Sequence, residues 1–137
     1  MPAKAELKSG FWLGLGLALA LQAISHTLMA LHADQSSLGL APLHAMTMGY
    51  LGATLFAMAT RVSSGHSGRP LAADDRAWAL YWILQLAVLL RVVSALWPAA
   101  GALPLLGAIS AWTLACCGWA LRYGSWFGRP RVDGRPG

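Results

Sequence analysis

Four stretches of about 20 mostly apolar residues follow one another in this chain, and they restrict its fold more than any other feature. A helix needs about 20 such residues to cross the hydrocarbon core of a bilayer. The stretches cover residues 11–32, 40–60, 77–97 and 103–123. The sequence therefore predicts an all-α, polytopic membrane protein built as a bundle of four transmembrane helices.

The composition agrees with a membrane protein. Hydrophobic residues make up 57% of the chain and charged residues 11%, with a mean hydropathy of +0.54. Soluble domains carry roughly 45–50% apolar and about 25% charged residues. A soluble chain of 137 residues could not bury so much apolar surface within itself. The first apolar stretch is too long for a cleaved signal peptide, so we expect it to be a permanent span.

The basic residues predict the orientation. Residues 34–42 and 98–102, which join the first helix to the second and the third to the fourth, contain no basic residue. Nine of the ten basic residues fall on the other side, which predicts that both termini are cytoplasmic. They are Lys4, Lys8, Arg61, Arg69, Arg76, Arg122, Arg129, Arg131 and Arg135. Because these residues flank apolar runs, they give no indication of nucleic-acid binding.

This topology divides the chain into three parts. Residues 1–10 form a cytoplasmic N-terminus, residues 11–127 the transmembrane domain, and residues 128–137 a basic cytoplasmic tail. The tail is rich in Gly, Pro and Arg, so we expect it to be disordered. An alternative is that it lies against anionic headgroups.

Small residues recur at helical spacing on the first two helices. Ala45, Gly49, Ala53 and Ala57 are spaced by four on the second, and a similar series starts at Gly10 on the first. Such residues let helix backbones approach closely in lipid. We therefore expect the first two helices to form a tight pair.

Titratable side chains gather in the outer half of the predicted bundle. They are His26 and His32 on the first helix, His44 on the second and Arg91 on the third. Neutral imidazoles are ligands for haem iron and copper, so His44 with His26 or His32 could hold haem b. Met48, one turn from His44, could be a soft ligand. Arg91 could neutralise a haem propionate.

Other interpretations stay open for several of these residues. A histidine near a helix end often bonds a neighbouring carbonyl, and this alternative is favoured for His32, beside Asp34. Residues 63–70, with Arg69, could bind an anion through backbone amides. A helix cap followed by a turn is the favoured alternative there. No Ser–His–Asp arrangement, paired carboxylates or HExxH motif is present, so an enzyme is not favoured.

The stretch HAMTMGYLGATLFAMATRVSSGHSGRPL, residues 44–71, resembles the C-terminal region of the NnrS family. The chain's ending, RPRVDGRPG, and Arg91 also fit that family, and the likeness is to the last third of its longer members. The matching residues are His44, Gly49, Gly52, Met58, Thr60, Arg61, Val62, Gly65, His66, Gly68, Arg69 and Pro70. The resemblance implies a multi-pass protein of the bacterial inner membrane that contains haem and copper and takes part in the nitric oxide response. It adds His66 to His44 as a functional position.

Three hypotheses follow for function. The first is a short NnrS-like protein that binds haem, and copper as a second metal, with nitric oxide as its ligand. The second is a cytochrome b-like electron-transfer subunit with bis-histidine iron. The third is a metal-free structural or assembly protein. The partners implied are the lipid bilayer and a second copy or larger membrane protein that completes the site.

Overall fold

The computed structural model describes residues 19–20, 22–24, 26–27, 30, 38–71 and 74–135. Within these ranges the regular elements are helices, as predicted. They are α2 (Ala41–His44), η1 (Ala45–Gly52), α3 (Ala53–His66), α4 (Asp75–Leu96), η2 (Pro98–Ala100) and α5 (Leu103–Gly124). The first predicted span falls mostly outside the described residues.

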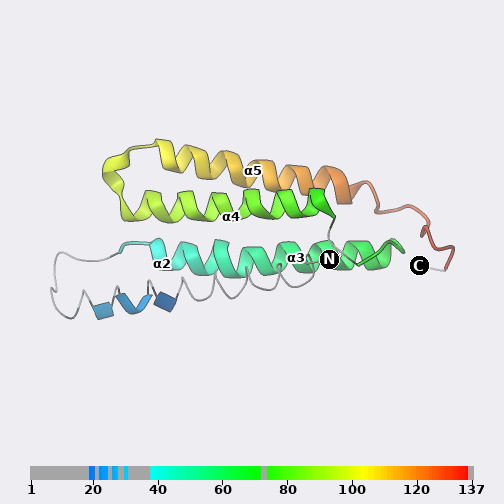
Figure 1. Ribbon diagram of the computed structural model, residues 1–137, viewed down its shortest axis with the longest axis horizontal. Helices are drawn as coiled ribbons and strands as arrows, with labels where there is room; N and C mark the ends of the chain where they lie inside the picture. The colour runs from blue at the N-terminus through cyan, green and yellow to red at the C-terminus, as the bar shows by residue number, and fades with distance from the viewer. Residues whose placement is uncertain are drawn as a thin grey trace.

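The described elements form three long helical rods. α2, η1 and α3 follow one another without a break and make the first rod, while α4 and α5 form an antiparallel hairpin (Figure 1). The short η2 helix and Gly101, with a φ of 70°, turn the chain between them. Glycine adopts a positive φ at little cost, which suits it to this turn. α3 and α5 therefore run parallel, and α4 runs against both.

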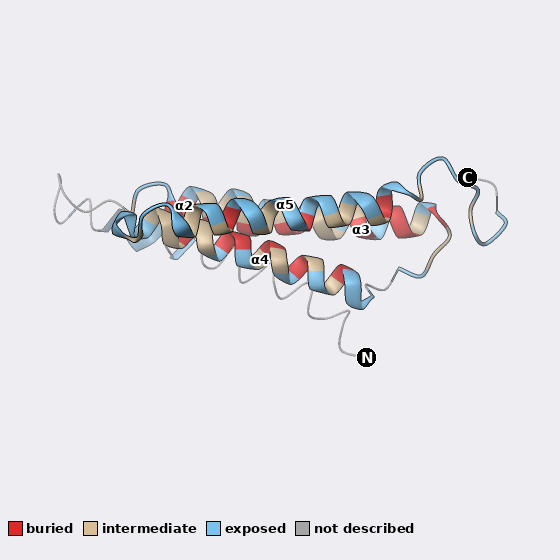
Figure 2. Ribbon diagram, turned by 90° about the horizontal axis from the view of Figure 1, so that it is seen from above, coloured by how far each residue is buried: buried red, intermediate tan, exposed pale blue. Residues whose placement is uncertain are grey.

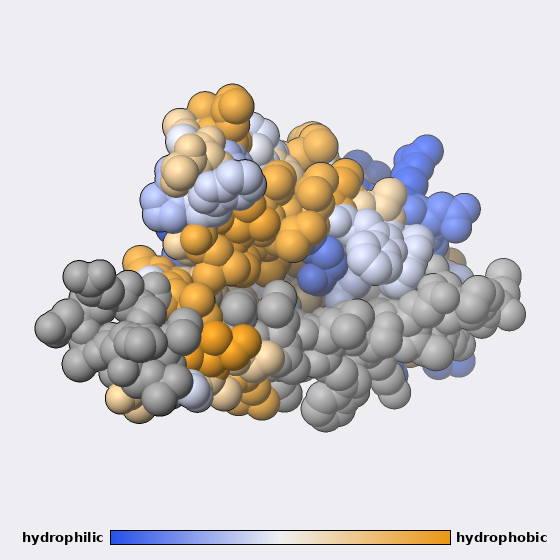
Figure 3. Space-filling view, turned by 60° about the vertical axis from the view of Figure 1, so that its left-hand side comes forward, coloured by the Kyte–Doolittle hydropathy of each residue, from blue (hydrophilic) through white to orange (hydrophobic). Residues whose placement is uncertain are grey.

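Two of the described helices, α4 and α5, are long and apolar enough to cross a membrane. Much of their apolar surface faces outward: Leu103 is 78% exposed and Leu121 is 80% exposed. Figure 2 shows the buried residues on the faces where the rods meet, and Figure 3 shows a broad apolar surface across the middle of the molecule. Exposed apolar surface of this extent is expected where lipid is the solvent, which supports a membrane protein.

The small-residue series on the first rod packs against α4. Ala45 clusters with Val88 and Val92. Ala53 clusters with Tyr81, Leu84 and Ala115. The tight pair expected between the first two helices stays a prediction, because Gly10 and its companions lie outside the described residues.

A π-helix explains why a strict spacing of four stays on one buried face. On an α-helix, each step of four residues drifts by about 40° around the axis. The wider turns of a π-helix hold more residues and reduce that drift. η1 spans Ala45–Gly52, and Ala41, Ala45, Gly49 and Ala53 are all buried. The sequence analysis predicted a plain helix over 40–60 and missed this change of winding.

α3 also continues six residues beyond the predicted end at Thr60, as far as His66. Polar side chains within it bond to the helix itself. The hydroxyl of Thr60 donates to the Phe56 carbonyl, and that of Ser64 donates to the Thr60 carbonyl. These internal bonds let a polar stretch remain helical. The helix therefore extends beyond the apolar stretch that ended at Thr60, to the cap expected within residues 63–70.

The tail folds back onto the end of α3. The backbone N–H of Val132 donates to the Ser67 carbonyl at 3.1 Å. Arg131 pairs with Asp133 at 2.6 Å, and the Asp133 side chain lies against Gly68. The tail is thus described as far as Arg135 with specific contacts, whereas its composition had led us to expect disorder.

Candidate metal and ligand site

His44 has a ring nitrogen with no protein partner. It lies at the end of α2, and its Nε2 atom is buried without a hydrogen bond to any described residue. A buried polar atom left without a partner is costly, about 1–3 kcal/mol. Such an atom calls for a ligand, and a buried imidazole nitrogen is a common metal ligand.

A hollow of about 290 Å³ lies close by, where η1, α4 and α5 meet. Met48 and Arg91 line it together with Trp112 of α5. The Arg91 charge is close enough to act on the His44 ring. The structure therefore brings two of the residues that the sequence singled out, Met48 and Arg91, to one hollow. His44 lies one turn before Met48 and does not itself line the hollow.

Small residues shape this hollow. A Cβ added at Gly52 would lie 3.1 Å from the Trp112 ring, and one at Gly107 would lie 3.1 Å from Leu90. The indole of Trp112 can therefore lie over η1 only because residue 52 has no side chain. The remaining lining is mostly apolar and consists of Leu105, Ala108, Ile109 and Thr113.

The predicted partner imidazoles are not assembled around His44 in the described residues. His26 is exposed, and its Nε2 lies 2.7 Å from the Gln22 amide one turn earlier. His32 lies outside the described residues. No group of three or more His, Cys, Asp or Glu side chains comes together within the described ranges.

The motif around residues 61–69 is a helix end. The N–H of Arg69 donates to the Ser64 carbonyl at 2.9 Å, and that of Gly68 donates to the Gly65 carbonyl at 3.2 Å. Gly68 has a φ of 72°. This is the Schellman pattern, so the cap interpretation is confirmed and the anion-loop alternative is not.

The motif side chains hold the tail and the end of α5. The Arg69 guanidinium stacks 4.2 Å from the centroid of the Trp126 ring. Arg61, Gly65 and His66 line a shallow surface together with Arg131. His66 lies at the opposite end of the first rod from His44, about 30 Å away at 1.5 Å per residue. One metal could not use both.

Sequence reasoning missed several polar contacts between helices and two buried polar atoms. Trp119 Nε1 donates to Thr60 Oγ1 at 2.9 Å, and Arg122 pairs with Asp74. Tyr81 Oη and Gln85 Nε2 are buried without a partner among the described residues. One signal was available for the first contact, because Trp112 and Trp119 are seven residues apart and so share one face of α5.

Comparison with known proteins decides the family. The family model described as NnrS protein matches residues 6–131. The chain belongs to the NnrS family. The match extends far beyond residues 44–71, so the NnrS likeness covers most of the chain. Membership supports a protein related to the nitric oxide response, and two apolar helices in an NnrS chain support a membrane location. No curated protein and no solved structure matches this NnrS chain.

Proposed function

We propose that this chain is a multi-pass inner-membrane protein of the nitric oxide response that binds haem at the His44 hollow. The observation that carries the proposal is the buried Nε2 of His44, which bonds to none of the described residues and lies one turn before Met48. Met48 lines a cavity together with Arg91. This donor set fits one side of a haem, with an imidazole for the iron and a guanidinium for a carboxylate at the macrocycle edge.

The residues around the hollow have separable roles. His44 would hold the iron, and Arg91 would pair with a propionate and fix the orientation. Trp112 and the apolar lining would keep water out, which strengthens that ion pair. When bound, haem supplies an iron atom that takes nitric oxide as a ligand.

The size of the hollow limits what this chain holds alone. Its volume of about 290 Å³ is at the lower end for ligand sites. The rest of the haem would have to be enclosed by the first helix, with His26 and His32, or by another subunit, so a second copy or larger membrane partner is part of the proposal. Copper is the second proposed metal, because Met48 offers a thioether one turn from His44 and thioethers are good ligands for Cu(I).

Four spans with both termini in the cytoplasm complete the proposal. Ala41–His66 is a continuous helical rod long enough to cross about 30 Å of hydrocarbon. The arginines of the described residues, Arg91 excepted, lie toward the end of the molecule where α3 ends and α4 begins. That segregation supports a cytoplasmic location for this end.

The absorption spectrum of protein purified after haem-replete expression tests the proposal. We expect a Soret band that is lost in His44→Ala and weakened in Arg91→Gln. His66→Ala is the matched control, since it removes the same side chain at the far end of the same rod and should keep the full band. Adding nitric oxide to the reduced protein should shift the band.

Two results would contradict the haem assignment. Wild-type protein without a Soret band would end it, and full haem retention in His44→Ala would remove the ligand. A Soret band that does not respond to nitric oxide or carbon monoxide would instead favour the bis-histidine electron-transfer subunit, whose iron has no open position.

A further inference from the structure

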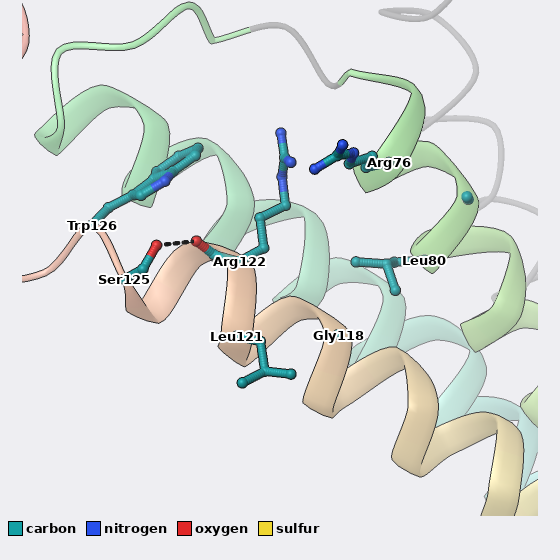
Figure 4. Close-up of a pocket in the computed structure, with 8 residues that line it drawn as sticks. Arg76, Leu80, Gly118, Leu121, Arg122, Ser125 and Trp126 are labelled. Carbon is teal, nitrogen blue, oxygen red and sulfur yellow. Dashed lines mark hydrogen bonds between the residues drawn. The ribbon is translucent and has the colours of Figure 1, made fainter.

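A second hollow lies at the basic end of the molecule, far from the His44 site. It is a groove of about 660 Å³ between the start of α4 and the end of α5. Two arginines, Arg76 from α4 and Arg122 from α5, line it together with Trp126. Figure 4 shows the side chains of Arg76 and Arg122 extending toward each other across the groove. Two guanidinium groups on one groove can both donate to a single anion bound between them.

Carboxylates lie near the two arginines but outside the groove. Arg122 pairs with Asp74, the N-cap residue of α4, whose side chain also accepts the N–H of Ala77. Asp75, the first residue of α4, is next to Arg76 in the sequence and does not line the groove. None of the described residues that line the groove is acidic. Asp74 also holds Arg122 in position before any ligand arrives, which reduces the entropy cost of binding.

The walls of the groove are apolar. Ala79, Leu80 and Leu121 line it, and Leu121 is 80% exposed. A Cβ added at Gly118 would lie 2.6 Å from Leu80 Cδ2, so the glycine allows Leu80 to lie close against α5. These walls belong to the two helices that are apolar enough to span a membrane. The apolar walls therefore face lipid tails, and the arginines lie where headgroups begin.

We propose that this groove is a binding site for an anionic phospholipid. The headgroup phosphate lies between Arg76 and Arg122, and an acyl chain follows Ala79, Leu80 and Leu121. Guanidinium groups form strong charge-assisted hydrogen bonds to phosphate. The apolar walls bind the acyl chain of the lipid, so the lipid gains a contact that a free phosphate ion cannot make. The site is independent of haem.

Native mass spectrometry of the full chain in detergent tests this proposal, with phosphatidylglycerol and phosphatidylcholine supplied at equal concentration. We expect preferential retention of phosphatidylglycerol and a loss of about tenfold in Arg76→Gln. Arg129→Gln, which removes an exposed arginine outside the groove, is the charge control. Circular dichroism confirms that each variant is folded, and the Soret band reports separately on the His44 site.

A second pair of variants tests the acyl-chain part of the site. Ala79→Phe fills the groove without changing charge and should lower retention of phosphatidylglycerol, whereas Ala120→Phe, on another face of α5, should not. Equal retention of the two lipids would overturn the proposal, as would equal losses in Arg76→Gln and Arg129→Gln. Displacement of the lipid by millimolar inorganic phosphate would show a simple anion site and would also overturn it.

Discussion

At the scale of single residues, the contact between Gly68 and Asp133 joins α3 to the tail. Gly68 ends α3 in the left-handed region, with a φ of 72°, and the Asp133 carboxyl packs directly on its Cα. A side chain at this position would be strained by the backbone and would also strike the tail. This residue therefore joins the helix end to the C-terminal segment.

Gly68→Ala should destabilise the folded chain by about 1–2 kcal/mol and release the tail, because a Cβ would lie 2.7 Å from Asp133 Cγ. Limited trypsin digestion in detergent, read by mass spectrometry, should show faster cleavage after Arg131, in the tail segment that contacts α3. Gly124→Ala is the control, since a Cβ there meets nothing within 4 Å. Identical digestion of the two variants would show that the tail does not depend on Gly68.

The Asp133 carboxyl should titrate at unusually low pH. Its hydrogen bond from Arg131 holds the pKa well below the ordinary value of 3.8. A lowered pKa in the folded state stabilises the docked tail above pH of about 4, and that contribution is lost only as the pH falls through the lower, folded value. A carbon NMR titration of the Asp133 carboxyl in micelles should give a midpoint well below 3.8. Arg131→Gln should return that titration midpoint toward 3.8. A midpoint already near 3.8 in the unaltered protein would exclude the pair.

At the scale of elements, three tryptophans connect α5 and the turn after it to the first rod and its C-terminal end. Trp112 lies over Gly52 of η1, Trp119 bonds to Thr60 of α3, and Trp126, just after α5, stacks on Arg69, just after α3. The contacts advance in step along both helices because these helices run parallel. The ring of Trp119 also stacks with that of Tyr123, with centroids 5.1 Å apart.

Trp119→Phe and Thr60→Val should be coupled. Either change removes the bond between Nε1 and Oγ1, so the double variant should lose less stability than the sum of the two single ones. The coupling should be about 0.5–1.5 kcal/mol. Thermal unfolding in detergent, followed by circular dichroism, gives the four values of the cycle. Strict additivity would mean that the bond contributes nothing.

Much of the helical framework could be predicted from the sequence, and the reasons for the exceptions are local. Hydropathy predicted 77–97 and 103–123, close to α4 at Asp75–Leu96 and α5 at Leu103–Gly124. Hydropathy does not reveal that the helix continues after Thr60, because this stretch is polar and its hydroxyl groups bond to the helix backbone. It also failed over η1, since no simple polarity pattern marks a π-helix.

The candidate site was only partly predictable. His44, Met48 and Arg91 were selected because titratable or soft side chains are uncommon in a membrane span and often functional. Met48 and Arg91 do line one hollow, and His44 lies one turn before Met48. The groove at Arg76 and Arg122 was not foreseen. Its arginines lie 46 residues apart in sequence and become neighbours only through the hairpin of α4 and α5.

At the scale of the whole molecule, charge and apolar surface are separated along the long axis. The described arginines other than Arg91 lie toward one end, and the turn at residues 97–102 at the other end carries no charged side chain. A membrane protein with basic residues at one end and an uncharged turn at the other has a defined orientation, because the inner face of the bilayer attracts cations.

Reporter fusions should confirm that orientation. Green fluorescent protein fused after Gly137 should fluoresce, because the proposed C-terminus is cytoplasmic. Alkaline phosphatase inserted after Gly101 should be active, because that turn is proposed to be periplasmic. Insertion of the phosphatase at Gly68, in the opposite turn, is the control and should give inactive enzyme. The reverse pattern would invert the topology.

The winding of η1 has a consequence for how the chain tolerates change. Because each turn of a π-helix holds more residues than an α-helical turn, the stretch from Ala45 to Gly52 sets the angle between the two ends of its rod. Losing one residue there would act on His44 as a rotation of roughly 100° rather than a mere shortening. The imidazole would then turn away from Arg91 while Thr60 kept its place against Trp119.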